Sequence, residues 1–309
     1  MNTKPSIKSI LLSLALLLSA LSPLAVQASN PVLGWVGQPY GIYHDSYKAL
    51  SDSLFEGPHR DHRELLRLLA DAAEADPSGE WELNRQLVSI HTDMYRHREG
   101  GFVINGGSSA EVFARQFLEV AAAARQKQLP LVRLRAIFDA AECYRLYAQN
   151  YERAFSLYNK LVAELASVSP RDFPMRPNIY REVANLYFHF REYDDAKTYY
   201  RIIAQDPEAK ASLYLLYYPA LHGLGICYRN GEGYYVRSDS CFHALLDDVT
   251  KVGEPAFHLW GGIAEGSLGQ NQYLQGHYDA ALPLLLSAAH DITRPYRIPQ
   301  KHKYEFVRF

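Results

Sequence analysis

The sequence predicts an all-α protein built from consecutive pairs of antiparallel helices. Apolar residues recur at intervals of three and four, which places them on one face of each helix. Four tyrosines, each at the start of a predicted second helix, lie 42, 41 and 44 residues apart. The chain has 309 residues, of which 48% are hydrophobic, so it can bury a large core. A near-constant interval of this kind is typical of repeat architectures. The four tyrosines are Tyr151, Tyr193, Tyr234 and Tyr278.

The clearest pair of helices lies in residues 178–207. Its two alanines, Ala184 and Ala196, allow the two backbones to approach closely. Larger side chains share the same helix faces and fill the space above and below the alanines. They are Tyr180, Val183 and Tyr187 on the first helix and Tyr200 and Ile203 on the second.

This pattern resembles a tetratricopeptide repeat (TPR): a large residue, an aliphatic–small pair, an aromatic residue, then alanine, an aromatic residue and a closing Pro207. The segment lacks the family's glycine after the aliphatic residue and its initial tryptophan. The resemblance implies a right-handed superhelical solenoid of antiparallel helix pairs. The interval of about 42 residues exceeds the usual length of about 34. We therefore expect helices one or two turns longer than standard, similar to the long-helix type found in bacterial proteins.

Related pairs predict that the repeat array extends over residues 130–292. The third pair matches least well, because Arg237 stands near the position of a small residue and its turn is expanded. The pairs follow from Phe138, Ala141, Tyr144, Ala154, Tyr158 and Leu161 in the first, Leu221, Leu224, Gly225, Tyr228, Phe242 and Leu245 in the third, and Leu268, Gly269, Tyr273, Ala281, Leu285 and Ala288 in the fourth.

The N-terminus has the features of a secretory signal peptide over residues 1–28. Two lysines precede an apolar run at 10–21, Pro23 interrupts it, and small residues precede a predicted cleavage site after Ala28. An uncleaved anchor is the alternative, but the run is short for a bilayer span of about 20 residues. No cysteine follows the run, which argues against a lipid anchor. We therefore expect an exported protein, periplasmic or secreted, without a stable membrane span after cleavage.

The remaining segments are less regular. The sequence predicts an irregular lead-in with a short helix at 46–55, followed by degenerate helical pairs that cap the array and a basic tail. The tail is a strap over the last helix, a frayed end or the point where a longer protein was cut. The predicted segments are the lead-in at 29–58, the degenerate pairs at 59–129 with helices at 60–75, 81–97 and 110–128, the Gly-rich loop at 100–109 and the tail at 293–309.

Composition and motifs give no support to catalysis or to nucleic-acid binding. The formal charge is −2, so no basic excess attracts nucleic acid. The sequence contains 12 histidines, but no HExxH, GxSxG, CxxC or Walker motif. His59 and His62 are best explained as a solvated helix start, because a zinc site needs further ligands nearby. We therefore predict no enzyme activity, no catalytic residues, no cofactor and no metal.

Three cysteines remain in the chain: Cys143, Cys227 and Cys241. In an oxidising compartment one bridge can form. Cys227 and Cys241 lie on adjacent helices of one predicted pair, so they are the candidates for a disulfide. Buried free thiols are the alternative, since cysteine packs well as a small apolar residue.

The resemblance also implies a concave groove lined by fixed positions of each first helix, suited to an extended peptide or a partner loop. Arg181 and Asn185 share one helix face and resemble a clamp for a peptide carboxylate. A solvated helix face is the alternative for each position. The residues that we expect to line the groove are Glu142, Arg145, Asn178, Arg181, Asn185, Phe188, His189, His222, Arg229, Gln270 and Tyr273.

The sequence thus predicts an extracytoplasmic scaffold that binds a protein or peptide. The alternative is the sensor or docking ectodomain of a transmembrane signalling or transcriptional regulator, with the effector module absent from this chain.

Overall fold

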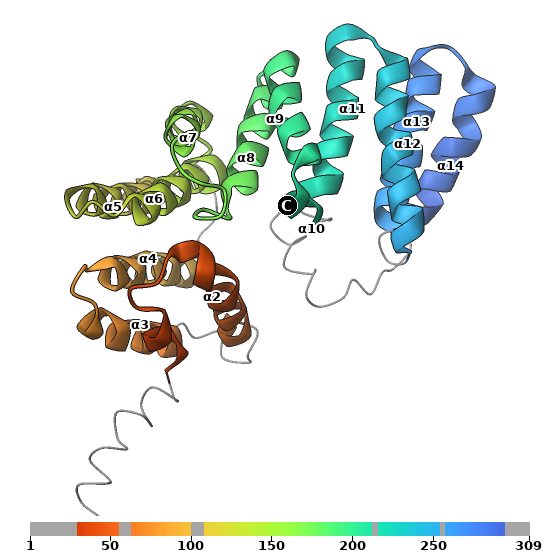
Figure 1. Cartoon of the computed structure of the whole chain (residues 1–309). Helices are drawn as coiled ribbons and strands as arrows, with labels where there is room; N and C mark the ends of the chain where they lie inside the picture. The colour runs from red at the N-terminus through yellow and green to blue at the C-terminus, as the bar shows by residue number, and fades with distance from the viewer. Residues whose placement is uncertain (1–29, 56–62, 100–107, 212–215, 254–256, 294–309) are drawn as a thin grey trace, which may run out of the picture. The chain divides into compact units, whose positions relative to one another are not determined.

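The computed structural model describes residues 30–55, 63–99, 108–211, 216–253 and 257–293, and within these ranges the chain is helical without a strand (Figure 1). It forms two compact units. Unit 1 comprises the described residues up to Leu157 together with Ser167–Pro174, and unit 2 comprises Tyr158–Ala166 and the described residues from Met175 onward. The predicted signal peptide, His59 and His62, most of the Gly-rich loop and nearly all of the basic tail lie outside the described ranges.

Unit 1 begins with a short 3₁₀ helix and continues with helices that pack in sequence. α3 packs against α4, α4 against α5, and α5 against α6. The pairing of α5 with α6 crosses residue 129, where the sequence analysis divides the N-terminal pairs from the array. The elements are η1 (Pro31–Trp35), α2 (Tyr40–Phe55), α3 (Arg63–Ala75), α4 (Glu80–Glu99), α5 (Ser108–Gln126), α6 (Pro130–Glu142), the π-helical turn η2 (Cys143–Tyr147) and the start of α7 (Tyr151–Leu165).

The lead-in is more helical than the sequence analysis expects. α2 begins at Tyr40, six residues before the predicted start at position 46. Tyr40, Tyr43 and Tyr47 lie at i, i+3 and i+7, so they share one face of the helix. The Tyr43 ring lies 5.1 Å from the Trp81 ring and 5.9 Å from the Trp35 ring. This aromatic contact holds the first turns of α2 in helical form.

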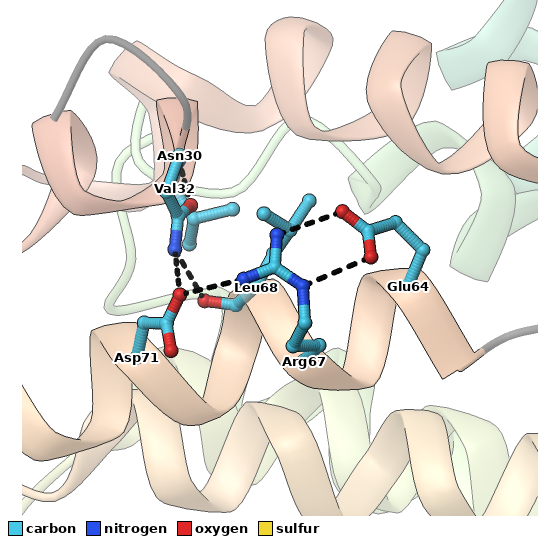
Figure 2. Close-up of polar contacts among 6 residues, drawn as sticks. All are labelled: Asn30, Val32, Glu64, Arg67, Leu68 and Asp71. Carbon is cyan, nitrogen blue, oxygen red and sulfur yellow. Dashed lines mark hydrogen bonds and ion pairs between the residues drawn. The ribbon is translucent and has the colours of Figure 1, made fainter. Parts of the chain in front are cut away.

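Asn30 anchors the start of the described chain to α3 (Figure 2). Its side-chain amide donates hydrogen bonds to the carbonyl oxygen of Leu68 and to Asp71 Oδ2, both at 3.0 Å. Its Oδ1 accepts from the backbone N–H of Val32 at 3.0 Å and so caps η1. Arg67 Nη1 donates to the same Asp71 oxygen at 3.2 Å. Asn30 is only 1% exposed, and each of its polar groups is satisfied.

A buried ion cluster completes the interior of unit 1. Asp139 contacts Arg135 Nε and His91 Nε2, both at 3.2 Å. Burial favours the protonated acid, but the adjacent Arg135 and His91 outweigh it and lower the pKa of Asp139. Arg135 also donates to the hydroxyl of Tyr40 at 3.4 Å. α2, α4 and α6 therefore meet at one charged centre.

Unit 2 consists of three hairpins that follow one another along the chain (Figure 1). Consecutive long helices are in contact: α8 with α9, α9 with α11, α11 with α12, α12 with α13, and α13 with α14. Within the described ranges no helix is both long and apolar enough to span a bilayer. The elements are α8 (Arg176–His189), α9 (Tyr193–Gln205), the short α10 (Pro207–Ala211), α11 (Tyr218–Glu232), α12 (Tyr235–Val252), the π-helical turn η4 (Phe257–Gly261), α13 (Gly262–Leu274) and α14 (Tyr278–Thr293).

The hairpin turns share one backbone conformation, which fixes the register of the repeat. Each turn contains a residue with positive φ two positions before the tyrosine that opens the second helix. The backbone N–H of the next residue then reaches back to a carbonyl five or six residues earlier, which is the usual way to close a helix C-terminus. The positive-φ residues are Gln149, Arg191, Gly233 and Gly276.

This register corrects the third repeat. Tyr235, and not Tyr234, opens α12, and Tyr234 is its N-cap. The intervals between opening tyrosines then become 42, 42 and 43 residues. The small residue of this repeat is Ser238, which is fully buried, whereas Arg237 is exposed. The expected mismatch at Arg237 is therefore wrong, because α12 begins one residue after Tyr234.

The second helices share one spacing in every repeat, and its positions are buried except Leu285 in the last helix. A small residue is followed four positions later by a large one and seven positions later by another apolar residue. Gly225 on α11 packs so close to the Phe242 ring that an added Cβ would lie 2.6 Å from it. The equivalent sets are Ala154, Tyr158 and Leu161; Ala196, Tyr200 and Ile203; Ser238, Phe242 and Leu245; and Ala281, Leu285 and Ala288.

Candidate functional site

The predicted carboxylate clamp on α8 is already occupied by a side chain of the same helix. Glu182 is 1% exposed and forms an ion pair with Arg181, whose Nε donates to Oε1 at 2.8 Å. Asn185 donates to the other Glu182 oxygen at 3.4 Å and accepts from the Tyr200 hydroxyl at 2.9 Å. Burial raises the pKa of Tyr200, so its hydroxyl remains a donor. Arg181 therefore neutralises the buried Glu182 carboxylate, and both Arg181 and Asn185 donate hydrogen bonds to it.

A second polar network joins α11 to α13. Arg229 Nη1 donates to Gln270 Oε1 at 2.8 Å and to Asn271 Oδ1 at 3.3 Å. Asn271, which is fully buried, donates to Ser238 Oγ at 2.9 Å and to Asp239 Oδ1 at 2.7 Å. Satisfied buried networks of this kind fix one arrangement of neighbouring helices. Arg229 and Gln270 are thus brought together as the sequence predicts, but as partners of each other.

His222 lies in the interior of the same pair of helices. Its Nε2 is 3.1 Å from Ser267 Oγ, and its ring contacts Phe242 and Trp260. Burial, with a smaller contribution from the nearby Arg229 charge, lowers the pKa of His222 to about 4. The imidazole is therefore neutral at pH 7, and His222 is a packing residue with one polar contact.

The remaining predicted residues of unit 2 lie toward solvent. His189 and Gln270 are exposed, and Tyr273 is 56% exposed. Asn178 and Phe188 are half-buried, and the Phe188 ring meets the Tyr193 ring edge-on at 5.6 Å. Asn178, Phe188, His189 and Tyr273 can contact another molecule without breaking a buried hydrogen bond, whereas the Gln270 side-chain oxygen already accepts from Arg229.

Glu142 and Arg145 belong to unit 1. Arg145 Nη2 and Nε donate to the two carboxylate oxygens of Glu142 at 3.0 and 3.1 Å. Both side chains are half-buried and neutralise each other across the junction of α6 and η2. They form a local ion pair within this unit.

The three cysteines are free thiols in the structure. Cys227 and Cys241 belong to the same apolar cluster of unit 2, but no bridge joins them. Burial raises the pKa of Cys143 and Cys227 to about 12 and that of Cys241 to about 11. The structure thus has free thiols, which the sequence analysis gives as the alternative to a disulfide.

Two sets of residues escape sequence reasoning. Glu182 lies on the same face of α8 as Ile179 and Leu186, at spacings of three and four, so its burial was readable from the helical period. The second set is a group of cations around Tyr228, described below, which comes from three helices. No local pattern identifies such a convergence.

The accessible side chains at the predicted positions of unit 2 are amide, imidazole and aromatic groups. Within them, no group of three or more histidine, cysteine or acidic side chains is placed to hold a metal ion. The buried ionisable groups of unit 2 described above are each paired with a neighbour. What remains accessible is a set of amide, imidazole and aromatic groups, which can form hydrogen bonds and apolar contacts.

Comparison with known proteins gives a fold. No protein-family model matches the chain, and no curated protein matches it. Among solved structures, one of BtubC (BKLC) from P. vanneervenii is similar, with a TM-score of 0.54 and 16% identity, covering 76% of this chain and 92% of that one. A second, of a candidate kinesin light chain from Podosopora anserina with nearly identical TPR-like repeats, gives a TM-score of 0.52 and 16% identity, covering 69% of this chain and 97% of that one.

The chain has a TPR-like repeat fold. The helix pairs and the repeated turns of unit 2 agree with this fold, and so does the family resemblance read from residues 178–207. At 16% identity the likeness concerns architecture alone.

Proposed function

We propose that this chain is an extracytoplasmic, non-catalytic scaffold that binds an extended peptide or a loop of a partner protein. The observation that carries the proposal is the group of exposed aromatic side chains at the turn ends of the three hairpins of unit 2. Solvent-exposed tyrosine and phenylalanine are enriched at the centres of protein interfaces. These residues are Phe190, Tyr234, Tyr273 and Tyr278.

The accessible residues of the first helices extend this aromatic group. His189 follows Phe188 at the end of α8 and contacts the Phe190 ring edge-on at 5.4 Å. Tyr273 contacts the Tyr278 ring at 5.4 Å on the last hairpin. Gln270 lies one turn before Tyr273 on α13 and supplies an exposed amide. Together they offer apolar contact and hydrogen bonds, which suits a segment of polypeptide with both apolar and polar side chains.

The test of this surface must avoid the buried residues. Arg181→Ala would leave Glu182 buried without its cation, so a loss of binding would follow from instability. His189→Ala with Tyr273→Ala removes accessible groups only. We expect this double variant to lose the proteins that co-purify with the mature wild-type chain, identified by mass spectrometry. His243→Ala with Val252→Ala, two exposed positions on α12, is the matched control and should retain them. Equal capture by both double variants contradicts the proposed surface.

Export is the second part of the proposal. Cleavage after Ala28 leaves Asn30 as the second residue of the mature chain and so preserves its contacts with Leu68 and Asp71. Cleavage a few residues later would remove this buried anchor. Intact-mass measurement of the full-length chain after expression and fractionation in a bacterial host checks the position. A mature protein that begins at Ser29 in the exported fraction supports the proposal, and an unprocessed cytosolic chain contradicts it.

A second candidate function is docking to a further module, as in the ectodomain of a membrane regulator. α14 exposes a group of leucines, with Leu282 at 60% and Leu286 at 62%. Leu285 is 37% exposed, whereas Tyr200 and Phe242 at the equivalent position are buried. A face of this kind favours contact with another hairpin or domain. If Leu282→Ser with Leu286→Ser abolishes partner capture that His189→Ala with Tyr273→Ala leaves intact, docking is the better description.

A further inference from the structure

Tyr228 of α11 is surrounded by three cationic side chains from the two neighbouring second helices. Lys197 Nζ lies 5.2 Å from the centroid of its ring, and Arg201 Cζ lies 5.7 Å from it, both from α9. Arg237 Cζ, from α12, also lies 5.7 Å from the same centroid. Each contact is favourable because a cation is attracted to the face of an aromatic ring. The three charges nevertheless repel one another.

One of the three cations is neutralised within the fold. Lys197 is 4% exposed, and its Nζ lies 2.7 Å from Asp194 Oδ1. The hydrogen bond and charge of Lys197 lower the pKa of Asp194, so this carboxylate is ionised at neutral pH. Lys197 and Asp194 together contribute no net charge.

The two arginines keep their charge. Arg201 Nη2 donates to the Tyr228 hydroxyl at 3.0 Å, and Arg237 also lies over the Tyr234 ring at 5.4 Å. Both side chains are exposed. Neither has a carboxylate within ion-pair distance among the residues that the structure describes. Cys241, which lies near Arg201, cannot supply an anion at neutral pH, because burial raises the pKa of its thiol to about 11.

The geometry points to an oxyanion site formed by Arg201 and Arg237 on the second helices of unit 2, where it takes the carboxylates of an acidic segment of the partner protein. A guanidinium presents five N–H donors, in pairs that match a carboxylate. Arg201 uses Nη2 on the Tyr228 hydroxyl, which leaves Nε and Nη1 as donors. Two forks held over one ring lie within reach of one short acidic segment. This site lies on α9 and α12 and adjoins Tyr234, one of the exposed aromatic residues at the turn ends.

The inference rests on the proposed function and names the chemistry of one part of the partner. Free phosphate offers the same oxyanion chemistry, so the experiment includes it. Carboxylates are favoured because the proposed partner is a segment of polypeptide, whose acidic side chains carry them, and a guanidinium matches a carboxylate in pairs of hydrogen bonds.

The test measures fluorescence anisotropy of a labelled hexaglutamate peptide titrated with the mature chain at low ionic strength. We expect saturable binding that Arg201→Gln with Arg237→Gln weakens by about tenfold or more, since charge-assisted hydrogen bonds contribute about 1.5–3 kcal/mol each. Lys160→Gln with Lys251→Gln removes the same charge from exposed positions and should retain the wild-type affinity. A labelled hexaglutamine peptide should not bind.

Arg201→Lys with Arg237→Lys guards against a loss of folding. It keeps both charges but removes the forks, so we expect wild-type helicity with intermediate affinity. Equal hexaglutamate binding by the wild type and the glutamine variant overturns the inference, and so does saturable binding of inorganic phosphate without binding of the peptide. Either result leaves partner capture through His189 and Tyr273 to be judged separately, so the two proposals can fail independently.

Discussion

Units 1 and 2 are both built from paired helices, but different kinds of interaction fix their packing. In unit 2 the same turn and the same spacing of a small residue with two apolar residues recur in each hairpin. In unit 1 the helices are held by contacts that occur once, between Tyr43 and Trp81, between Asp139 and Arg135, and between Asn30 and α3. Repetition distributes stability over equivalent sites, whereas a unique contact concentrates it in a few residues. Single substitutions should therefore have larger effects in unit 1.

The largest effect is expected from Arg135→Ala. The substitution leaves Asp139 buried without its nearest permanent cation, and breaking a buried pair in this way costs about 3–5 kcal/mol. Urea unfolding followed by tryptophan fluorescence measures the loss. A Trp260→Phe background leaves Trp35 and Trp81, both in unit 1, as the only tryptophans that report on unfolding.

The control for this prediction is Arg125→Ala, at an exposed position of α5. It should change the free energy of unfolding by less than about 0.5 kcal/mol. The wild type should also lose stability in acid. The folded pKa of Asp139 is depressed, so its contribution is complete above the unfolded pKa of about 4 and is lost as pH falls through the folded value. An Arg135→Ala protein as stable as the control contradicts the role of the ion cluster.

The second largest effect concerns His222 in unit 2. Its pKa is about 4 in the folded state and about 6.5 in the unfolded chain, so the unfolded state binds the proton more readily. The contribution of neutral His222 to the free energy of unfolding is fully present above pH 6.5. It declines as pH falls toward 4, by up to about 3 kcal/mol. His222→Gln retains a polar side chain without this titration. Its free energy of unfolding should vary less between pH 6.5 and 4, as measured by circular dichroism in urea.

A pH dependence that is the same in both proteins would show that His222 does not titrate in the folded interior. His243→Gln provides the matched control, because His243 is exposed on the neighbouring helix α12. This control should follow the wild-type curve.

Asn30→Ala tests the anchor of unit 1, and we expect an intermediate loss of stability. It removes two donated hydrogen bonds and the cap of η1, and it leaves the N–H of buried Val32 without its acceptor. Unsatisfied buried groups cost about 1–3 kcal/mol. Thermal unfolding of the mature chain measures the effect, with exposed Gln126→Ala as the comparison. A shift no larger than that of Gln126→Ala would mean that the start of the chain contributes little to unit 1.

The contrast between the units also explains what could be predicted from the sequence. The repeat interval, the opening tyrosines and Ala184 with Ala196 identified the fold of unit 2, because a repeated local pattern is visible in one dimension. The register error at Tyr234 arose because two tyrosines, Tyr234 and Tyr235, are adjacent, and only the backbone conformation shows which of them opens the helix. The early start of α2 depends on contacts with Trp35 and Trp81, and the latter is distant in the sequence.

The candidate site was harder to predict than the fold. The face of a helix can be read from spacing, but whether a polar residue on it meets solvent depends on its partner. Arg181 lies on the expected face and yet pairs with the adjacent Glu182, while Arg229 pairs with Gln270 of the next repeat. The exposed residues His189 and Tyr273 could be distinguished from them only in the folded chain.

The smallest effects should come from the hairpin turns, and here equivalent positions in unit 2 predict opposite signs. Gly233→Ala places a Cβ on a residue with φ of +65°, where its side chain meets no other atom within 4 Å, so the cost of about 1 kcal/mol is purely conformational. Arg191 has the same φ of +65° in the preceding repeat, and Arg191→Gly removes that strain. The loss of backbone freedom by glycine offsets part of the gain, which leaves about 0.5 kcal/mol of stabilisation. In thermal unfolding, Gly233→Ala should have a lower midpoint temperature than the wild type, and Arg191→Gly should have a higher one. Shifts of the same sign would mean that the two turns are not equivalent, and the single register assigned to the hairpins of unit 2 would fail with them.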